Sequence, residues 1–339
     1  MSESAGHRSF LVTCIGAYDD SGLGTGGFVC LHEGATVVLD KIDSTGLCAH
    51  GETVYRFARG IRAIVGYRRD GFRLLLNIPE GRDVHDIVVR DGQFVCASTG
   101  NNEVLWLDPL GGVLRRWKAD GERDAWHLNC FCDVEGRLHI SGFGRFATHR
   151  GWTEGCLGRG FVLDLESGKE VVNGLNGPHN PRLIDGEWVI CDSHVSALVL
   201  QRPGEAARRI ALDGFTRGLD HDADFFYVGE SANRKAPLPC DHSSVAIVNR
   251  RTQEVADRIA VPFPEIYEVL KIAPEFAAAI LENPAAFQLD QTDERLAALE
   301  NQVAIGWREN HELKRRLSDV RGFEQLRARL LTIKRRLFG

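Results

Sequence analysis

The stretch HDIVVRDGQFVCAS at residues 85–98 joins two short apolar runs through a tight Asp-Gly turn. The same order recurs in HLNCFCDVEGRLHISG (127–142), HNPRLIDGEWVICD (179–192), RGLDHDADFFYVGE (217–230) and, more weakly, STGLCAHGETVYRFA (44–58). Two-residue turns with glycine second suit β-hairpins, because glycine tolerates a positive φ. Such turns are Asp91-Gly92, Glu135-Gly136 and Asp185-Gly186. Each segment is therefore predicted to form two paired β-strands.

The repeats are spaced like the blades of a β-propeller. They begin at residues 44, 85, 127, 179 and 217, which gives spacings of 41, 42, 52 and 38 residues. A period near 40 residues with about four short strands per unit is typical of that fold. The longest spacing contains an insertion, FGRFATHRGWTEGCLGRG at 143–160, which we interpret either as an ordinary surface loop or as a lid or binding lip over the central opening.

Closing the ring requires strands from both ends of the β region. PEIYEVLKI at 264–272 reads as a first strand with no partner strands after it. RSFLVTCIG at 8–16 and GGFVCLHEGATVVLDKI at 26–42 read as later strands with no first strand before them. Pairing the two sets would complete one composite blade and remove the open sheet edges. The sequence thus predicts an all-β, six-bladed β-propeller over residues 1–273, with seven blades as the alternative.

The composition changes after residue 273. Residues 274–339 are rich in Ala, Leu, Glu, Gln and Arg, with apolar residues at helical spacing, so we predict an α-helical arm. A heptad pattern places Leu289, Leu296, Val303, Asn310 and Leu317 at a, and Leu299, Gly306, Leu313 and Val320 at d. A lone polar residue at a can fix a two-stranded register, so one expectation is a homodimer through a coiled coil. The alternatives are that the arm packs on its own propeller, or that the basic residues 321–339 contact an anionic membrane surface or an acidic partner.

The overall composition is that of a soluble globular protein. Of the 339 residues, 43% are apolar and 26% are charged, which excludes a disordered chain. No apolar run approaches the roughly 18–20 residues needed to cross a bilayer, so no transmembrane segment is expected. The first residues, MSESAGHR, lack the features of a signal peptide, and the nine cysteines then read as reduced thiols of a cytoplasmic protein. The net charge of −6 gives no reason to expect nucleic-acid binding.

Polar residues begin the first strand of successive repeats. His85, His127 and His179 hold this position in three consecutive repeats, and Arg217 holds it in the next. The leading ends of these strands should meet around the propeller axis, so we expect one axial funnel. Three neutral imidazoles with an open fourth position would form a catalytic metal site. Imidazole suits several divalent metals, so the metal is not identified. A metal-free polar pocket and a purely structural role are the alternatives for the same histidines.

Charged residues near the same strand ends are candidates for substrate binding and acid–base chemistry. Arg182 and Arg217 could together clamp a small anionic ligand, or each could form a salt bridge with a neighbouring carboxylate. Glu265 and Tyr267 are two residues apart and should share one face of a strand, opposite Glu268. Three residues beside the histidines could orient their second nitrogen atoms, namely Asp86, Asn129 and Asn180.

Several stretches of the second half resemble a known family. They are Pro178-His179-Asn180-Pro181-Arg182, Thr216-Arg217-Gly218-Leu219, Val228-Gly229-Glu230-Ser231 and Pro262-Phe263-Pro264-Glu265-Ile266-Tyr267. The chain is similar to a bacterial family catalogued as a domain of unknown function, and the resemblance implies an NHL-like or SMP-30-like six-bladed propeller. A serine commonly follows the histidine of the proline-rich motif in that family, whereas this chain has Asn180. The resemblance implies no activity, and the arm lies outside it.

Two classes of function are compatible with these observations. In the first, the chain is a small-molecule enzyme of the hydrolase or lyase type, in which His85, His127 and His179 hold a divalent metal. Arg217 or Arg182 would then anchor an anionic group of the substrate, and Glu265 would act as the base, with Tyr267 as a further candidate for acid–base chemistry. In the second, the propeller is a non-catalytic scaffold that binds a glycan, a peptide or a protein. A propeller alone does not decide between them, because the fold supports many functions.

Overall fold

The computed structural model describes residues 8–16, 23–108, 110–231 and 243–289. The chain divides into two compact units, Met1–Asp290 and Gln291–Gly339. The first unit therefore extends past residue 273, where the sequence places the start of the arm. Of the predicted heptad, every position after Leu289 lies outside the described residues, so the coiled coil and the homodimer stay predictions.

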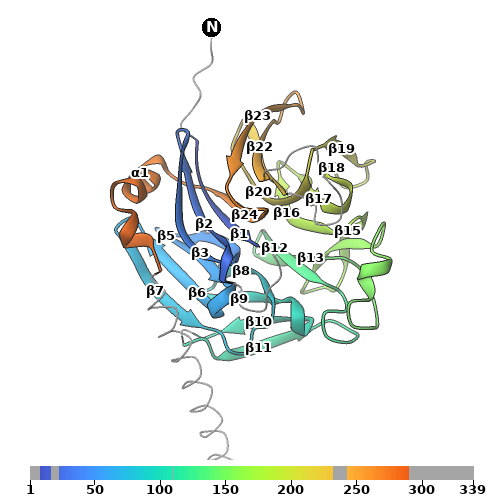
Figure 1. Cartoon of the computed structure of the whole chain (residues 1–339). Helices are drawn as coiled ribbons and strands as arrows, with labels where there is room; N and C mark the ends of the chain where they lie inside the picture. Colours follow the sequence, from blue (N-terminus) through green and yellow to red (C-terminus); the bar gives the residue numbers. More distant parts are fainter. Residues whose placement is uncertain (1–7, 17–22, 109, 232–242, 290–339) are drawn as a thin grey trace, which may run out of the picture. The chain divides into compact units, whose positions relative to one another are not determined.

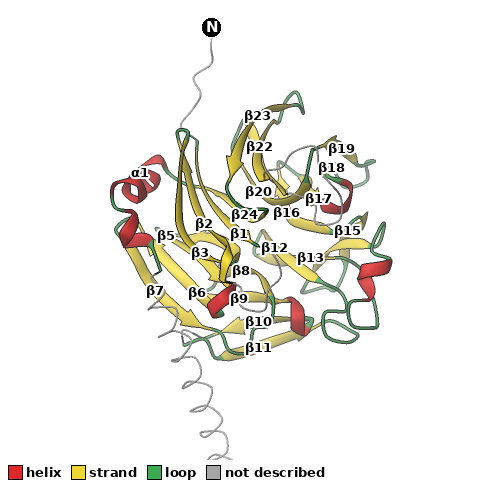
Figure 2. Cartoon of the chain, in the orientation of Figure 1, coloured by secondary structure: helices red, strands yellow, loops and turns green. Residues whose placement is uncertain are grey.

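The described residues form six four-stranded antiparallel sheets, each of which is one blade of a propeller (Figures 1 and 2). Blades 1 to 3, written from the innermost strand outward, are β4 (Ser44–His50), β5 (Thr53–Ala58), β6 (Ala63–Arg68) and β7 (Gly71–Asn77); β8 (Val84–Arg90), β9 (Gln93–Ser98), β10 (Glu103–Leu107) and β11 (Val113–Lys118); and β12 (Leu128–Val134), β13 (Arg137–Gly142), β14 (Gly160–Asp164) and β15 (Glu170–Leu175).

Blades 4 to 6 complete the ring. Their strands are β16 (Pro178–Ile184), β17 (Glu187–Asp192), β18 (Ala197–Gln201) and β19 (Arg208–Ala211); β20 (Phe215–His221), β21 (Phe225–Ser231), β22 (Ser243–Asn249) and β23 (Val255–Val261); and β24 (Glu265–Lys271), β1 (Ser9–Ile15), β2 (Leu23–His32) and β3 (Ala35–Ile42). The prediction of six blades, and not seven, is confirmed.

Blade 6 joins the two ends of the propeller region. Its innermost strand β24 pairs antiparallel with β1, in a register that places Lys271 opposite Phe10 and Glu265 opposite Ile15. In Figure 1 the orange β24 lies beside the blue β1. The first strands of all six blades contact one another in a closed circle: β4 with β8, β8 with β12, and so on to β24, which contacts β4. The first strand of every repeat is therefore the innermost strand of its blade.

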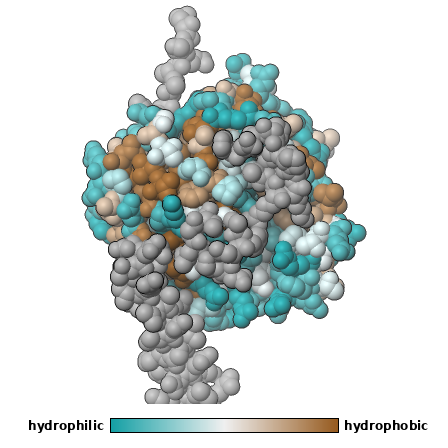
Figure 3. Space-filling model, in the orientation of Figure 1, coloured by the Kyte–Doolittle hydropathy of each residue, from teal (hydrophilic) through white to brown (hydrophobic). Residues whose placement is uncertain are grey.

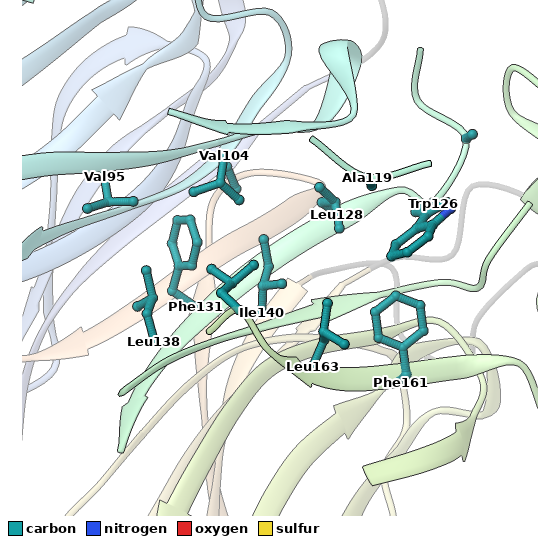
Figure 4. Close-up of a cluster of buried hydrophobic side chains, with 13 residues drawn as sticks. Val95, Val104, Ala119, Trp126, Leu128, Phe131, Leu138, Ile140, Phe161 and Leu163 are labelled. Carbon is teal, nitrogen blue, oxygen red and sulfur yellow. The ribbon is translucent and has the colours of Figure 1, made fainter. Parts of the chain in front are cut away.

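The hydrophobic core lies between neighbouring blades. Figure 4 shows one cluster, in which Val95 and Val104 of blade 2 pack against Phe131, Ile140 and Leu163 of blade 3. Each of these five side chains is at most 2% exposed, and burying one such side chain contributes roughly 1.5–3 kcal/mol. Similar clusters join blades 1 and 2, 3 and 4, 4 and 5, and 5 and 6. Apolar side chains on both sheet faces explain why the strands read as nearly continuous apolar runs.

Five 3₁₀ turns and one helix complete the described structure. The 3₁₀ turns are η1 (Arg59–Ile61), η2 (Thr99–Asn101), η3 (Gly151–Glu154), η4 (Ser193–Val195) and η5 (Pro284–Phe287), and the helix is α1 (Pro274–Glu282). α1 begins at a proline, whose fixed φ suits the first helical position. It packs beside β2, and Phe287 of η5 stacks on Tyr67 with 6.4 Å between ring centroids. These contacts explain why the compact unit continues beyond β24.

No helix in the described part of the chain combines the length and the apolar character that crossing a membrane requires. In Figure 3, hydrophilic residues cover most of the described rim of the face in view.

Every innermost strand departs from regular pairing near its start. The residues at these bulges are Gly46 in β4, His85 in β8, Asn129 and Cys130 in β12, Asn180 and Pro181 in β16, Arg217 and Gly218 in β20, and Tyr267 in β24. A bulge inserts an extra residue, bends the strand and re-aims the side chains beside it. Most polar residues singled out from the sequence stand at or next to these bulges.

Glycine is required at one of these bulges for two separate reasons. Gly218 has a φ of +81°, a conformation that side chains with a Cβ rarely adopt. A Cβ at this position would also lie 2.8 Å from the backbone nitrogen of Val269 in β24. The innermost strands of blades 5 and 6 therefore approach closely enough for Arg217 and Glu265 to meet.

Candidate functional site

Five of the predicted site residues gather at one end of the propeller axis, which we call the histidine end. His85 and His127 meet edge to face with ring centroids 4.9 Å apart, and His85 meets Tyr267 at 5.4 Å. Arg217 donates from Nη1 to Glu265 Oε1 at 2.8 Å, and its guanidinium carbon lies 4.2 Å from the centre of the Tyr267 ring. These groups come from three innermost strands and from the residue before a fourth, so only the closed ring brings them together.

His127 is held by a carboxylate that the sequence analysis missed. Its Nδ1 lies 2.7 Å from Oδ1 of Asp124, three residues earlier in the loop that leads to β12. The carboxylate accepts a proton from Nδ1, so Nε2 carries the lone pair of the neutral imidazole. Asp124 and His127 both have a positive φ, of 49° and 50°. Backbone conformations of this kind in residues other than glycine cluster at functional sites.

The insertion in blade 3 covers one side of His127. Trp152 of η3 lies 4.0 Å from the His127 ring, centroid to centroid, and its Nε1 donates to the carbonyl of Asp124 at 3.1 Å. Phe143, at the start of the insertion, lies 4.4 Å from the same imidazole ring. Through Phe143 and Trp152, the insertion contributes an aromatic wall to the histidine end.

Burial keeps His127 neutral. It lowers the pKa of the imidazole to about 4, although Asp124 acts in the opposite direction. Within the described residues, Nε2 of His127 has no hydrogen-bond partner. The base form of a fixed imidazole is thus available at neutral pH.

His85 is oriented by the neighbouring blade. Its Nδ1 donates to Oδ1 of Asn129 at 2.8 Å, and Nδ2 of Asn129 donates to the carbonyl of His127, which fixes the orientation of that amide. Nε2 of His85 lies 3.5 Å from Asp83. Burial would raise the pKa of Asp83, but His85 and Arg59 outweigh burial and hold this pKa well below its usual range. Of the three expected orienting residues, Asn129 alone contacts one of the histidines, and it serves the histidine of the preceding blade.

His179 differs from the other two histidines. Ser193 donates its hydroxyl proton to the carbonyl of Thr216 at 2.5 Å, so its oxygen accepts from Nδ1 of His179 at 2.7 Å. Nε2 of His179 then accepts from Nη2 of Arg217 at 2.7 Å. Burial first, and Arg217 second, lower the pKa of His179 well below its usual range. Both nitrogens are therefore engaged, and the side chain serves to position Arg217.

These contacts do not fit the expected three-histidine metal shell. His179 offers no free lone pair, and it is fully buried, whereas His85, His127, Arg217 and Glu265 keep 5–7% of their surface exposed. In the described ranges, no three His, Cys, Asp or Glu side chains are grouped so that they could hold a metal ion. The three side chains do share one end of the axis, as predicted, but two of them face its opening and the third lies behind Arg217.

Arg182 lies elsewhere, at what we call the hairpin end of the axis, where the innermost strands run into their turns. Its Nη1 donates to the carbonyls of Phe131 and Pro181 at 3.3 and 3.0 Å, and its Nη2 is 3.8 Å from Oε1 of Glu268. Arg182 and Arg217 therefore do not form a joint clamp, and Arg217 instead forms a salt bridge with a carboxylate, which is the other alternative that the sequence left open. The bulges are the physical reason, because they turn Arg217 toward the histidines while Arg182 follows the strand to the other end.

Two buried carboxyl groups accompany Arg182. Asp86 accepts from the backbone nitrogens of Ile87 and Phe131, both at 2.8 Å, and Glu268 accepts from Leu219 at 3.2 Å and from the Asn180 amide. Burial raises the pKa of Asp86 to about 6 and that of Glu268 to about 8, against the opposing effect of Arg182 on each. The register with β1 pairs Glu265 with Ile15 and Glu268 with Thr13, which share one face, so the bulge at Tyr267 overturns the alternation expected for these two glutamates.

A larger cavity, of about 890 Å³, lies away from the axis at the turns of blades 4 and 5. Several of its charged residues pair with one another, as Arg250 does with Asp185 and Lys271 with Asp222. The histidine end holds a neutral base and a fixed ion pair side by side, so we place the candidate chemistry there.

The missed residues carry weak sequence signals. Asp124 could have been found from its spacing of three residues before His127, but Ser193 is an ordinary residue after a strand in the sequence. Ser193 belongs to a repeated device, since Thr99 and Ser231 in other blades also donate to a carbonyl at the start of the next blade. Only the blade-to-blade contacts show that one of these hydroxyls also holds a histidine.

Comparison with protein families gives a match over residues 78–281, to the family described as "Domain of unknown function (DUF4915)". The chain belongs to this family. The matched region of the DUF4915 chain contains all seven residues proposed for the site from its sequence, as well as Asp124 and Trp152. Blade 1 and strands β1 to β3 lie before it. No curated protein matches the chain.

Solved structures similar to the DUF4915 chain share its fold at low identity. A chain of the nidogen/laminin complex is 9% identical with a TM-score of 0.56, and covers 78% of this chain and 99% of its own length. A protein of unknown function from Bacteroides caccae is 14% identical with a TM-score of 0.51, over 78% and 99% of the two chains. A luciferin-regenerating enzyme is 14% identical with a TM-score of 0.51, over 68% and 80%. At such identities the likeness concerns the fold alone.

Proposed function

We propose that the histidine end is the active site of a small-molecule enzyme of the hydrolase or lyase type, in which His127 accepts the proton. The observation that carries the proposal is the Asp124–His127 pair, in which Nδ1 is fixed at 2.7 Å from the carboxylate and Nε2 has no hydrogen-bond partner among the described residues. A base oriented in this way by a third group is the recurring arrangement of acid–base sites.

The surroundings of His127 suit proton transfer. A neutral imidazole can take a proton from a water that attacks a carbonyl, or from a carbon next to one. A pKa near 4 makes the free imidazole a weak base, and an anionic group bound beside it would raise this pKa toward neutrality. The Arg217–Glu265 ion pair places a fixed positive and a fixed negative charge at the same end, where they can orient the polar part of a substrate.

The proposal assigns different roles to the other residues. His85, held by Asn129, is a second contact for the substrate, and Tyr267 closes the site between His85 and Arg217. His179 is a positioning residue that acts through Arg217. A resident metal is not required, because His179 cannot supply the third ligand in the arrangement described.

The test is a screen for turnover with the purified full-length chain. The panel contains lactones, carboxylic esters and compounds that eliminate a leaving group β to a carbonyl. One class should be turned over, and His127→Asn should lower its kcat/KM by about 100-fold or more. Asp124→Asn should give a smaller loss, because it frees the imidazole to adopt the wrong tautomer. The matched control is His139→Gln, which replaces a buried imidazole bonded to the carbonyl of Arg137, away from the axis.

Two results would overturn the proposal. If no class is turned over, or if His127→Asn retains full activity, the non-catalytic scaffold becomes the better reading of the propeller. If elemental analysis finds one divalent metal per chain that disappears in both His85→Ala and His127→Ala, these histidines are metal ligands and His127 is not the proton acceptor.

A further inference from the structure

A separate cavity of about 220 Å³ opens at the hairpin end of the axis. Its lining comes from five of the innermost strands: Leu47 and Cys48 of β4, Asp86, Ile87 and Val88 of β8, Phe131 and Cys132 of β12 with Asp133, Arg182 and Leu183 of β16, and His221 of β20. A water occupies roughly 30 Å³ in the liquid, so the cavity has room for about seven waters or a compound of similar size. Its walls combine apolar side chains, such as Val88, Phe131 and Leu183, with charged ones.

Arg182 presents unused hydrogen-bond donors to this cavity. Its Nη1 is engaged by two backbone carbonyls, and its Nη2 is 3.8 Å from Glu268, beyond hydrogen-bond distance. In the part of the chain that the structure describes, Nε and Nη2 donate to no acceptor. These two atoms form the edge of a guanidinium that binds both oxygens of a carboxylate. The Arg182 side chain keeps 28% of its surface exposed, so the edge is accessible.

His221 also lines the cavity and has an unpaired ring nitrogen beneath its surface. Its Nδ1 is buried and has no hydrogen-bond partner within the described residues. A buried polar atom without a partner destabilises the folded state by roughly 1–3 kcal/mol. The carboxyl oxygens of Asp86, in contrast, are already occupied by two backbone nitrogens. The cavity thus has a guanidinium edge that lacks partners on its surface and an imidazole nitrogen without a partner beneath it.

We propose that this cavity is a second ligand site and that it binds a small carboxylate. The two carboxylate oxygens accept from Nε and Nη2 of Arg182, and Val88, Phe131 and Leu183 surround a short carbon chain. The site is distinct from the histidine end, because no residue of the Asp124–His127 pair or of the Arg217–Glu265 pair lines it.

The neighbouring carboxyl groups do not exclude an anion. Burial raises the pKa of Glu268 to about 8, so this group is mostly protonated at neutral pH. Both oxygens of Asp86 accept from backbone nitrogens, and Asp133 is exposed to solvent, so neither carboxylate occupies the Nε–Nη2 edge of Arg182. A bound carboxylate would supply acceptors for that edge.

The test is a calorimetric titration of the full-length chain with sodium acetate and sodium butanoate. We expect one saturable site, with butanoate the tighter ligand because its chain contacts the apolar walls. Arg182→Gln should weaken binding by at least tenfold. The matched control is Arg208→Gln, since Arg208 is also an arginine paired with a glutamate, Glu187, but lies outside the axial cavity. His127→Asn should leave the titration unchanged, which separates this site from the proposed active site.

A second variant covers the case in which Arg182→Gln does not fold. Leu183 lines the cavity and is 36% exposed, so Leu183→Trp can fill the opening without disturbing the core. It should also abolish binding. The proposal is wrong if neither carboxylate binds at millimolar concentration, if binding survives in Leu183→Trp, or if His127→Asn removes it. Saturable binding of inorganic phosphate in place of either carboxylate would likewise reject the assigned ligand class.

Discussion

The two ends of the axial channel are built from the same six strands and have opposite chemistry. At the histidine end, bulges direct His85 and Arg217 inward, and burial holds His127 and His179 in their neutral base forms. At the hairpin end, the regular part of the strands presents Arg182 with two buried carboxyl groups, whose pKa values burial raises. Burial therefore favours the neutral form at both ends, but for a base at one end and for an acid at the other.

The difference shows which residues the fold holds firmly. The Arg217–Glu265 pair is almost completely buried, with side chains 7% and 9% exposed and a separation of 2.8 Å. Arg182 is 28% exposed and 3.8 Å from Glu268. Charges of the first kind are fixed in place and suit an active site, whereas Arg182 can turn toward a ligand.

The largest expected effect compares the two arginines directly. Arg217→Met should lower the free energy of unfolding by about 3–5 kcal/mol, because it leaves Glu265 buried without the guanidinium. Arg182→Met should lower it by about 1 kcal/mol or less, because its ion pair is longer and partly solvated. Urea unfolding followed by circular dichroism measures both. Equal losses would show that the two ends do not differ in this way.

Lowering the pH should destabilise the folded state through the histidine end. The folded-state pKa of His127 is about 4, below the unfolded value of about 6.5, so the unfolded chain binds the extra proton first. The stability contributed by neutral His127 is complete above pH 6.5 and is lost as the pH falls toward 4. By pH 5 the loss should reach about 2 kcal/mol. His127→Gln should show a correspondingly smaller fall between pH 7 and pH 5 in the same unfolding measurement, and an unchanged slope would contradict the assignment.

Raising the pH should destabilise the folded state through the hairpin end, and this is the smallest of the expected effects. The folded-state pKa of Glu268 is about 8, above its unfolded value of about 4.3, so its contribution is complete below pH 4.3 and is lost as the pH rises through 8. From pH 7 to pH 9 the free energy of unfolding should fall by about 1 kcal/mol.

Glu268→Gln tests this assignment through the slope and not through the absolute stability. Its new amide would face the Asn180 amide that now donates to the carboxyl group, so the variant should be less stable at pH 7. It should nevertheless lose the decline between pH 7 and pH 9. A variant with the parental decline would place the titrating group elsewhere.

Much of the architecture was readable from the chain. The Asp-Gly and Glu-Gly turns have the positive φ values that the hairpins require, as Asp91 and Gly92 do at 50° and 72°. The period near 40 residues predicted the blades, and the unpartnered strand at 264–272 predicted the composite blade that closes the ring. These features are local or periodic, and backbone conformation and strand pairing follow such patterns closely.

The site was only partly readable. Repetition identified the axial positions of His85, His127, Arg217 and Glu265, because equivalent positions of equivalent repeats must meet around the axis. Strict alternation along a strand says nothing about bulges, which send Arg217 and Arg182 to opposite ends. The sequence also gives no sign of the hydrogen-bond partners of the two ring nitrogens of His179, since these partners, Ser193 and Arg217, are 14 and 38 residues away.

By itself, then, the sequence determined the six blades, the hairpins, the composite blade and the set of polar residues around the axis. Only the tertiary structure decided which nitrogen of each histidine is free, which arginine belongs to which end, and that Asp124 and Trp152 complete the site. The physical reason is the range of the interactions. Hairpins and blade spacing depend on neighbouring residues, whereas hydrogen bonds between blades depend on sub-ångström shifts of strands that meet only when the ring closes.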